Sequence, residues 1–166
     1  PCRALVSVNS VESAAKLIEY MKTNGIKYGI LGRGSNVLAA DEGFDGVILL
    51  FGSDFSQIEV KGNTIRCDAG ASLASACVHA QQNGLSGMEN LFGIPGTVGG
   101  ALYMNAGAYG SEMKDVVLSA EYIDENCRIR SISAKDMELS YRHSVFSGTS
   151  NVITSVTMQL TEGDPA

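Results

Sequence analysis

The order of apolar and polar residues predicts an α+β chain of short strands, two clear helices and long loops. Ala4–Val8 is an apolar run that predicts a strand, and Ser10 stands where the N-cap of a helix belongs. Asn24-Gly25 closes that helix. Its apolar face carries Val11, Ala14, Ala15, Ile18 and Met21 at helical spacing.

Two further strands complete a first folding unit. Lys27–Leu31 and Gly46–Leu50 are apolar runs separated by the loop Gly32–Asn36 and a polar connection. The result is a β-α-β-loop-β unit, from which we predict a first subdomain over residues 1–52.

The remaining sequence predicts a second unit over residues 53–166. Alternation on both sides of Gly62-Asn63 predicts a hairpin, and Ser72 can cap a helix that ends at Asn83-Gly84. A second hairpin and a last strand are predicted at Val116–Ile123, Arg128–Ile132 and Val152–Leu160.

Charge and cysteine usage narrow the class of protein. The net charge of −6 argues against a nucleic-acid or anionic-membrane partner, which clustered Lys and Arg would bind. The uncharged run Leu91–Ser111 is long enough to cross a bilayer, but its glycines and Pro95 make a span a poor interpretation. The four cysteines are scattered, so we expect buried, reduced thiols, no metal site and a cytoplasmic protein. They are Cys2, Cys67, Cys77 and Cys127.

The loop Gly32–Asn36, "GRGSN", has the composition of a phosphate-binding turn. Two glycines around one residue let successive N–H groups face one hollow, and Ser35 and Asn36 add side-chain donors. It is not a Walker loop, because it lacks lysine, and Val37 stands where a dinucleotide fingerprint needs glycine. An ordinary tight turn remains the alternative.

A second glycine-rich stretch, Leu91–Gly110, holds six glycines and no charge. Pro95-Gly96 suits a turn, and Thr97 can cap a short helix over Val98–Met104 whose N–H groups and dipole would favour an anion. Backbone amides would let this neutral segment bind a pyrophosphate. Two closely packed backbones without a ligand are the alternative.

Three motifs in this order resemble a known family. They are "ILGRGSNVL" (30–38), "GLSGMENLFGIPGTVGGALYMNAGAYGSE" (84–112) and "YRHSVF" (141–146). Together they are similar to the UDP-N-acetylenolpyruvoylglucosamine reductases, flavoenzymes of bacterial peptidoglycan precursor synthesis. The resemblance implies a two-subdomain FAD-binding fold of the vanillyl-alcohol-oxidase or PCMH type.

The resemblance also implies the roles of individual residues. Tyr141, Arg142 and Ser144 match the family's substrate-side motif, with Arg142 as the catalytic arginine. The residues that would hold FAD are Gly32, Arg33, Gly34, Ser35, Asn36, Gly93, Ile94, Pro95, Gly96, Thr97, Gly99, Gly100, Asn105, Ala106 and Gly107.

The family's reaction defines the expected partners. NADPH reduces FAD, and a hydride then passes to the enolpyruvyl group of a nucleotide-sugar substrate in the bacterial cytoplasm. Members of the family carry a C-terminal substrate domain that supplies a serine proton donor and a glutamate. That domain would begin near Ala166, so we expect this chain to be a catalytically incomplete FAD-binding portion.

Two other functions remain open at this point. One is an FAD-linked oxidase of the same fold acting on a sugar or alcohol, and the other is a non-catalytic flavin-binding module. Many such oxidases attach flavin through His or Cys in the first phosphate loop. Here Arg33 and Ser35 occupy that loop, so covalent attachment there is not expected.

Overall fold

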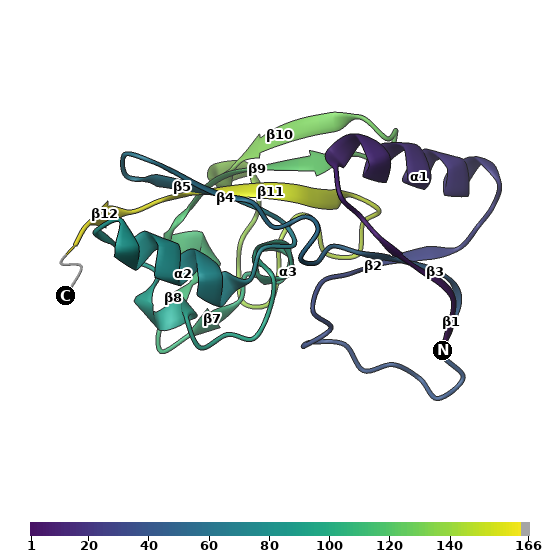
Figure 1. Ribbon diagram of the computed structural model, residues 1–166, viewed down its shortest axis with the longest axis horizontal. Helices are drawn as coiled ribbons and strands as arrows, with labels where there is room; N and C mark the ends of the chain where they lie inside the picture. The colour runs from purple at the N-terminus through teal and green to yellow at the C-terminus, as the bar shows by residue number, and fades with distance from the viewer. Residues whose placement is uncertain (164–166) are drawn as a thin grey trace.

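The computed structural model of the protein describes residues 1–163 and contains two main sheets (Figure 1). A three-stranded parallel sheet has the order β1-β3-β2, and a five-stranded antiparallel sheet has the order β10-β9-β11-β5-β4. This arrangement confirms the predicted α+β class. The strands are β1 Cys2–Ser7, β2 Tyr28–Leu31, β3 Phe44–Leu50, β4 Ile58–Lys61, β5 Thr64–Asp68, β9 Val117–Ile123, β10 Ile129–Ser133 and β11 Val152–Gln159.

The first sheet and helix α1 (Val11–Thr23) form one end of the molecule (Figure 1). The predicted cap is confirmed, because the Ser10 hydroxyl oxygen accepts from the Ser13 N–H at 3.1 Å. Ala14, Ile18 and Met21 are buried on the predicted helical face. The hydrophobic period of α1 therefore fixes which face meets the core.

Helices α2 (Leu73–Gln82) and α3 (Val98–Tyr103) lie on one side of the five-stranded sheet (Figure 1). Strand residues such as Ile65, Cys67 and Val156 are fully buried in that core. Burial raises the pKa of the Cys67 thiol to about 12 and that of Cys77 to about 11. Both thiols therefore stay protonated at neutral pH and pack as small apolar residues do. The prediction of buried thiols is confirmed for these two and is wrong for Cys2, which is exposed.

Two details differ from the sequence prediction. Helix α2 begins after Ser72, but the Ser72 side chain does not cap it and instead accepts from the Arg33 guanidinium at 3.4 Å. Four two-residue strands also pair where no alternation could be seen, since two residues are too short to show a period. They are β6 Leu85–Ser86, β7 Gly107–Ala108, β8 Ser111–Glu112 and β12 Thr161–Glu162. Three 3₁₀ turns complete the fold: Glu89–Leu91, Met113–Asp115 and Ala134–Asp136.

A hydrogen bond and a close backbone approach are among the contacts that join the two halves of the chain. The Lys22 ammonium of α1 donates to the Glu125 carbonyl in the turn between β9 and β10, at 2.7 Å. Gly70, just after β5, lies against the segment that follows β3, where a Cβ on Gly70 would stand 2.5 Å from the Gly52 carbonyl oxygen. The backbone after β5 therefore packs directly against the backbone of the segment that connects the two sheets.

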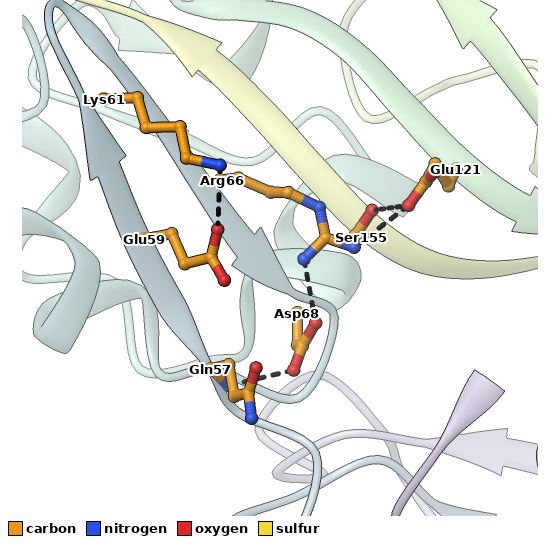
Figure 2. Close-up of polar contacts among 7 residues, drawn as sticks. All are labelled: Gln57, Glu59, Lys61, Arg66, Asp68, Glu121 and Ser155. Atoms are coloured by element: carbon orange, nitrogen blue, oxygen red, sulfur yellow. Dashed lines mark hydrogen bonds and ion pairs between the residues drawn. The ribbon is translucent and has the colours of Figure 1, made fainter.

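A polar network crosses the face of the five-stranded sheet that α2 and α3 leave uncovered (Figure 2). Arg66 on β5 donates to Glu121 on β9 at 3.0 Å and to Asp68 at 3.4 Å. The Ser155 hydroxyl of the intervening strand β11 also donates to Glu121, at 2.7 Å, and Asp68 accepts from the Gln57 N–H. The network thus ties β5, β11 and β9 together.

Glu121→Gln tests this network through its pH dependence. The Ser155 hydrogen bond and the Arg66 guanidinium lower the pKa of Glu121 below its unfolded value. The resulting stabilisation is complete above about pH 4.3, the ordinary Glu pKa. It is lost as pH falls through the lower folded-state pKa. Urea unfolding at several pH values should therefore show a shallower acid loss of stability in the variant.

Glu19→Gln is the matched control, since Glu19 is an exposed carboxylate on α1. The control should follow the parent chain at every pH. An acid profile for Glu121→Gln that coincides with that of the parent chain would contradict a stabilising Glu121 carboxylate.

Within residues 1–163, none of the helices is long and apolar enough to cross a membrane.

Candidate functional site

A cavity of about 990 Å³ lies between the two sheets, beside the end of β2, the start of β11 and the exposed side of α3. This volume is near the upper end of the range for ligand pockets, about 300–1,000 Å³. Both glycine-rich segments border the cavity, as do Lys22 and Arg142. Its size suits a large, extended ligand rather than a small metabolite.

The two predicted glycine segments meet across this cavity. A Cβ on Gly32 would stand 2.5 Å from the Thr97 hydroxyl oxygen, and one on Gly96 would stand 3.6 Å from the Ser35 hydroxyl oxygen. The absence of a side chain at Gly32 lets the loops touch. The predicted residues that line the cavity are Gly32, Arg33, Gly34, Ser35, Asn36, Ile94, Pro95, Gly96, Thr97, Gly99, Gly100, Ala106, Gly107 and Arg142.

Four predicted residues do not line it: Gly93, Asn105, Tyr141 and Ser144. Asn105 is buried, and its carboxamide accepts from the Lys114 N–H and donates to the Ser140 carbonyl and to Glu112. Ser144 is fully buried, and its hydroxyl donates to the Tyr103 carbonyl at 2.6 Å. Protein groups already satisfy the hydrogen bonds of the Asn105 and Ser144 side chains. The two side chains therefore support the fold around the cavity and do not make the expected ligand contacts.

Free backbone donors lie in the first loop, and the Gly96 and Thr97 N–H groups of the second segment also meet no acceptor within residues 1–163. Within residues 1–163, no protein acceptor meets the N–H groups of residues 33–36. A row of such donors at a glycine-rich turn is a chemical match for phosphate oxygens. The loop therefore keeps the donors that the sequence predicted for it.

Helix α3 does not keep its expected donors. The Val98 and Gly99 N–H groups donate to the carbonyls of Ala71 and Ala69, and the Gly100 N–H donates to the Thr97 hydroxyl. A Cβ on Gly99 would stand 2.6 Å from the Ala69 Cβ. The expectation that these three helix N–H groups are free for an anion is therefore wrong, since protein acceptors already use them and Gly99 serves close backbone packing. A cofactor contact from this segment stays a prediction.

The charged residues that line the cavity are positive, although the chain as a whole is negative. Lys22, Lys27, Arg33 and Arg142 line the cavity, and no Asp or Glu of residues 1–163 does so, although the net charge is −6. Like-sign charges around a partly enclosed space attract an oppositely charged ligand. The cavity therefore favours an anion.

The sequence reasoning missed part of this lining. Lys22 and Lys27 flank the turn between α1 and β2, and only the folded topology brings them to the cavity. Tyr103 and the segment 148–151 line its other side. The glycine, threonine and serine residues of that segment resemble an ordinary loop, so only their position after the "YRHSVF" motif could have drawn attention to them.

Arg142 has an unusual backbone conformation. Its φ is +53°, in the left-handed region that favours glycine, and it occupies a tight turn closed by two hydrogen bonds between Ser140 and His143. One guanidinium N–H donates to the Asn36 carboxamide oxygen at 3.0 Å. A strained residue held by its surroundings at a cavity is a recognised mark of a functional position.

The comparison with protein families decides the class. Residues 2–133 match the family described as "FAD binding domain". The chain belongs to this family. The FAD-binding domain takes FAD as its cofactor, which agrees with the anion-binding character of the cavity.

The FAD-binding domain is similar to curated proteins named UDP-N-acetylenolpyruvoylglucosamine reductase. It is 39% identical to the protein of Lactobacillus helveticus over 93% of this chain and 52% of that protein. It is 37% identical to the protein of Clostridium perfringens (strain SM101 / Type A) over 100% of this chain and 54% of that protein. The chain thus spans about half the length of the curated relatives it matches.

Solved structures confirm the expected fold type of the FAD-binding domain. A crystal structure of the reductase from Thermus caldophilus matches with a TM-score of 0.83 and 31% identity, over 97% of this chain and 56% of that one. Glucooligosaccharide oxidase from Acremonium strictum matches with a TM-score of 0.70 but only 16% identity, over 97% of this chain and 36% of that one. The second likeness shows the fold alone.

The residues present fit FAD. The free N–H groups of residues 33–36 and the Arg33 guanidinium of the same loop suit a diphosphate. Apolar wall residues, among them Ile30, Leu31 and Ile153, suit the flat faces of its ring systems. Both chemical halves of the cofactor therefore find matching surfaces in one cavity.

Proposed function

We propose that this chain is the FAD-binding portion of an NADPH-dependent UDP-N-acetylenolpyruvoylglucosamine reductase. One observation carries the proposal. The cavity has free loop amides and four cationic side chains, and one of the four is Arg142, the arginine of the motif "YRHSVF". The relatives named as this reductase, at 35–41% identity, support the same assignment.

The proposed roles follow from the chemistry of each group. The amides of residues 33–36, with Arg33 in the same loop, hold the cofactor's diphosphate. When bound, FAD accepts a hydride from NADPH and passes it to the enolpyruvyl group of the substrate. Arg142 stabilises the negative charge that develops on the enolic carboxylate, and its guanidinium keeps its charge throughout. A general acid must protonate the neighbouring carbon.

The two proposed subdomains are residues 1–52 and 53–166. Support comes from the sheets, since β1–β3 fall within the first range and β4–β11 within the second. Tyr141 stays a proposed substrate contact, because its side chain is 84% exposed in the turn beside Arg142. We also propose that the activity belongs to a bacterial, cytoplasmic protein of cell-wall synthesis, and that this chain alone is inactive.

The fold likeness to a sugar oxidase keeps one rival function in view. In an oxidase, a sugar or alcohol would reduce the bound flavin and oxygen would reoxidise it. In the proposed reductase, NADPH reduces the flavin and the enolpyruvyl nucleotide sugar reoxidises it. The two functions therefore differ in which substrate bleaches the flavin absorbance and which restores it.

Anaerobic flavin spectroscopy on the complete protein that contains this chain tests the proposal. We expect NADPH to bleach the visible flavin absorbance, and UDP-N-acetylglucosamine enolpyruvate to restore it without oxygen. Bleaching by glucose or another sugar, with no response to NADPH, would overturn the reductase in favour of the oxidase. Under the same conditions, substrate turnover by residues 1–166 alone would overturn the proposed incompleteness of this chain.

A further inference from the structure

Asn36 is the side chain that connects the first glycine loop to Arg142. The Arg142 Nη2–H group donates to the Asn36 Oδ1 atom at 3.0 Å, across 106 positions of the sequence. Both residues line the cavity and both are exposed. An exposed hydrogen bond of this kind contributes little net stability to the fold. Its position at the cavity suggests a role other than stability.

The backbone of Arg142 is held on the opposite side. The Asn105 carboxamide donates to the Ser140 carbonyl at 2.9 Å, and the Ser144 hydroxyl donates to the Tyr103 carbonyl. These buried contacts fix the turn in which Arg142 has a φ of +53°. They fix the Cα atom but leave a long side chain with several rotatable bonds. Among residues 1–163, Asn36 makes the one hydrogen bond to the Arg142 guanidinium.

We infer that Asn36 is a positioning residue that aims the Arg142 guanidinium into the cavity. The inference rests on the proposed function and adds to it. The main chain of the first loop offers N–H groups to the diphosphate, while its last side chain orients the arginine. One loop thereby couples cofactor binding to the placement of the catalytic cation.

The residue type suits this role. An amide oxygen orients a guanidinium through one hydrogen bond without cancelling its charge, whereas a carboxylate at the same place would form an ion pair. The remaining N–H groups of Arg142 stay available to an anionic substrate. A direct contact from the Asn36 side chain to FAD, which the family resemblance implied, is the competing role.

The test compares midpoint potentials of the bound flavin in the complete, FAD-loaded protein. Removing a cation beside the flavin disfavours the more negative reduced form and so lowers the potential. We expect Arg142→Ala to lower the potential, and Asn36→Ala to lower it by at least half as much. The double variant should equal Arg142→Ala, because Asn36 acts through the arginine. FAD affinity should change less than threefold in Asn36→Ala.

Asn90→Ala is the matched control. The Asn90 carboxamide donates to the Ser111 hydroxyl oxygen at 2.9 Å, and neither residue lines the cavity. It should leave the potential unchanged. A second measurement needs no cofactor: NMR relaxation of the Arg142 Nε–H group in residues 1–166. Asn36→Ala should increase its motion, and Asn90→Ala should not.

The outcomes separate the two proposals. A normal potential and an ordered Arg142 in Asn36→Ala, with a lowered potential in Arg142→Ala, would overturn the positioning role alone. A tenfold weaker FAD affinity in Asn36→Ala with an unchanged potential would also overturn it, in favour of direct cofactor contact. An unchanged potential in Arg142→Ala would overturn the placement of Arg142 beside the flavin, and with it the proposed catalytic role.

Discussion

Replacing Arg142 by alanine should lower kcat of the complete reductase by about 100- to 1,000-fold, the cost of losing one donor to a developing anion. The reason is that the guanidinium stabilises charge that appears in the transition state rather than in the bound substrate. KM should therefore change much less than kcat. The ratio of the parent kcat to the variant kcat should stay constant across pH 6–9, since guanidinium groups in proteins remain charged over this range. Steady-state kinetics with saturating NADPH measures kcat, KM and the pH dependence of the ratio.

Arg128→Ala is a suitable control for this experiment. Arg128 is an exposed arginine between β9 and β10 and is not part of the cavity lining. Its replacement should leave kcat within about twofold, as most surface substitutions change little. A fall in kcat for Arg142→Ala no larger than that of the control would contradict a catalytic role for Arg142.

Replacing Gly70 by alanine should destabilise the fold by about 3 kcal/mol or more, the upper end of overpacking costs. Gly70 is buried, and an added Cβ would meet the carbonyl oxygens of Phe55 and Gly52 and the Phe51 carbonyl carbon at 2.8 Å. These are backbone atoms, which cannot rotate away as a flexible side chain can. Urea unfolding of residues 1–166 at neutral pH measures the loss.

Gly52→Ala provides the matched control from the other side of the same contact. A Cβ on Gly52 would meet only Leu50 side-chain atoms, at 3.7 and 3.9 Å. That substitution should be neutral or slightly stabilising, since it reduces the freedom of the unfolded chain. Equal stabilities for the two variants would show that the close approach at Gly70 is not a constraint on the fold.

Local sequence signals predicted most of the architecture. The apolar period of residues 11–23, the Ser10 cap and the turn at Gly62-Asn63 each depend on neighbours along the chain, and each is confirmed. The strand order is not a local property. The pairing of β11 between β9 and β5 joins segments far apart in sequence, and its register follows from packing rather than from the alternation of any one strand.

The candidate site shows the same division. The composition of "GRGSN" indicated free amides, and the folded loop has them. The start of α3 carried a similar signal, but the carbonyls of Ala69 and Ala71 take its donors in the fold. No pattern near Lys22 or Lys27 points to an anion, since their contribution arises only when α1 and β2 are placed against the second sheet.

Titration of residues 1–166 with FAD, followed by flavin fluorescence, is the most direct test that this cavity holds the cofactor. Gly96→Val is the probe, because a Cβ there would meet only the Ser35 hydroxyl oxygen at 3.6 Å and would otherwise project into free space. We predict that the parent chain binds FAD saturably and that Gly96→Val binds it at least tenfold more weakly. The unfolding midpoint of Gly96→Val should equal that of the parent chain, and Gly52→Ala should bind FAD with normal affinity. Equal FAD affinity in Gly96→Val and the parent chain would contradict a cofactor site between the two glycine-rich segments.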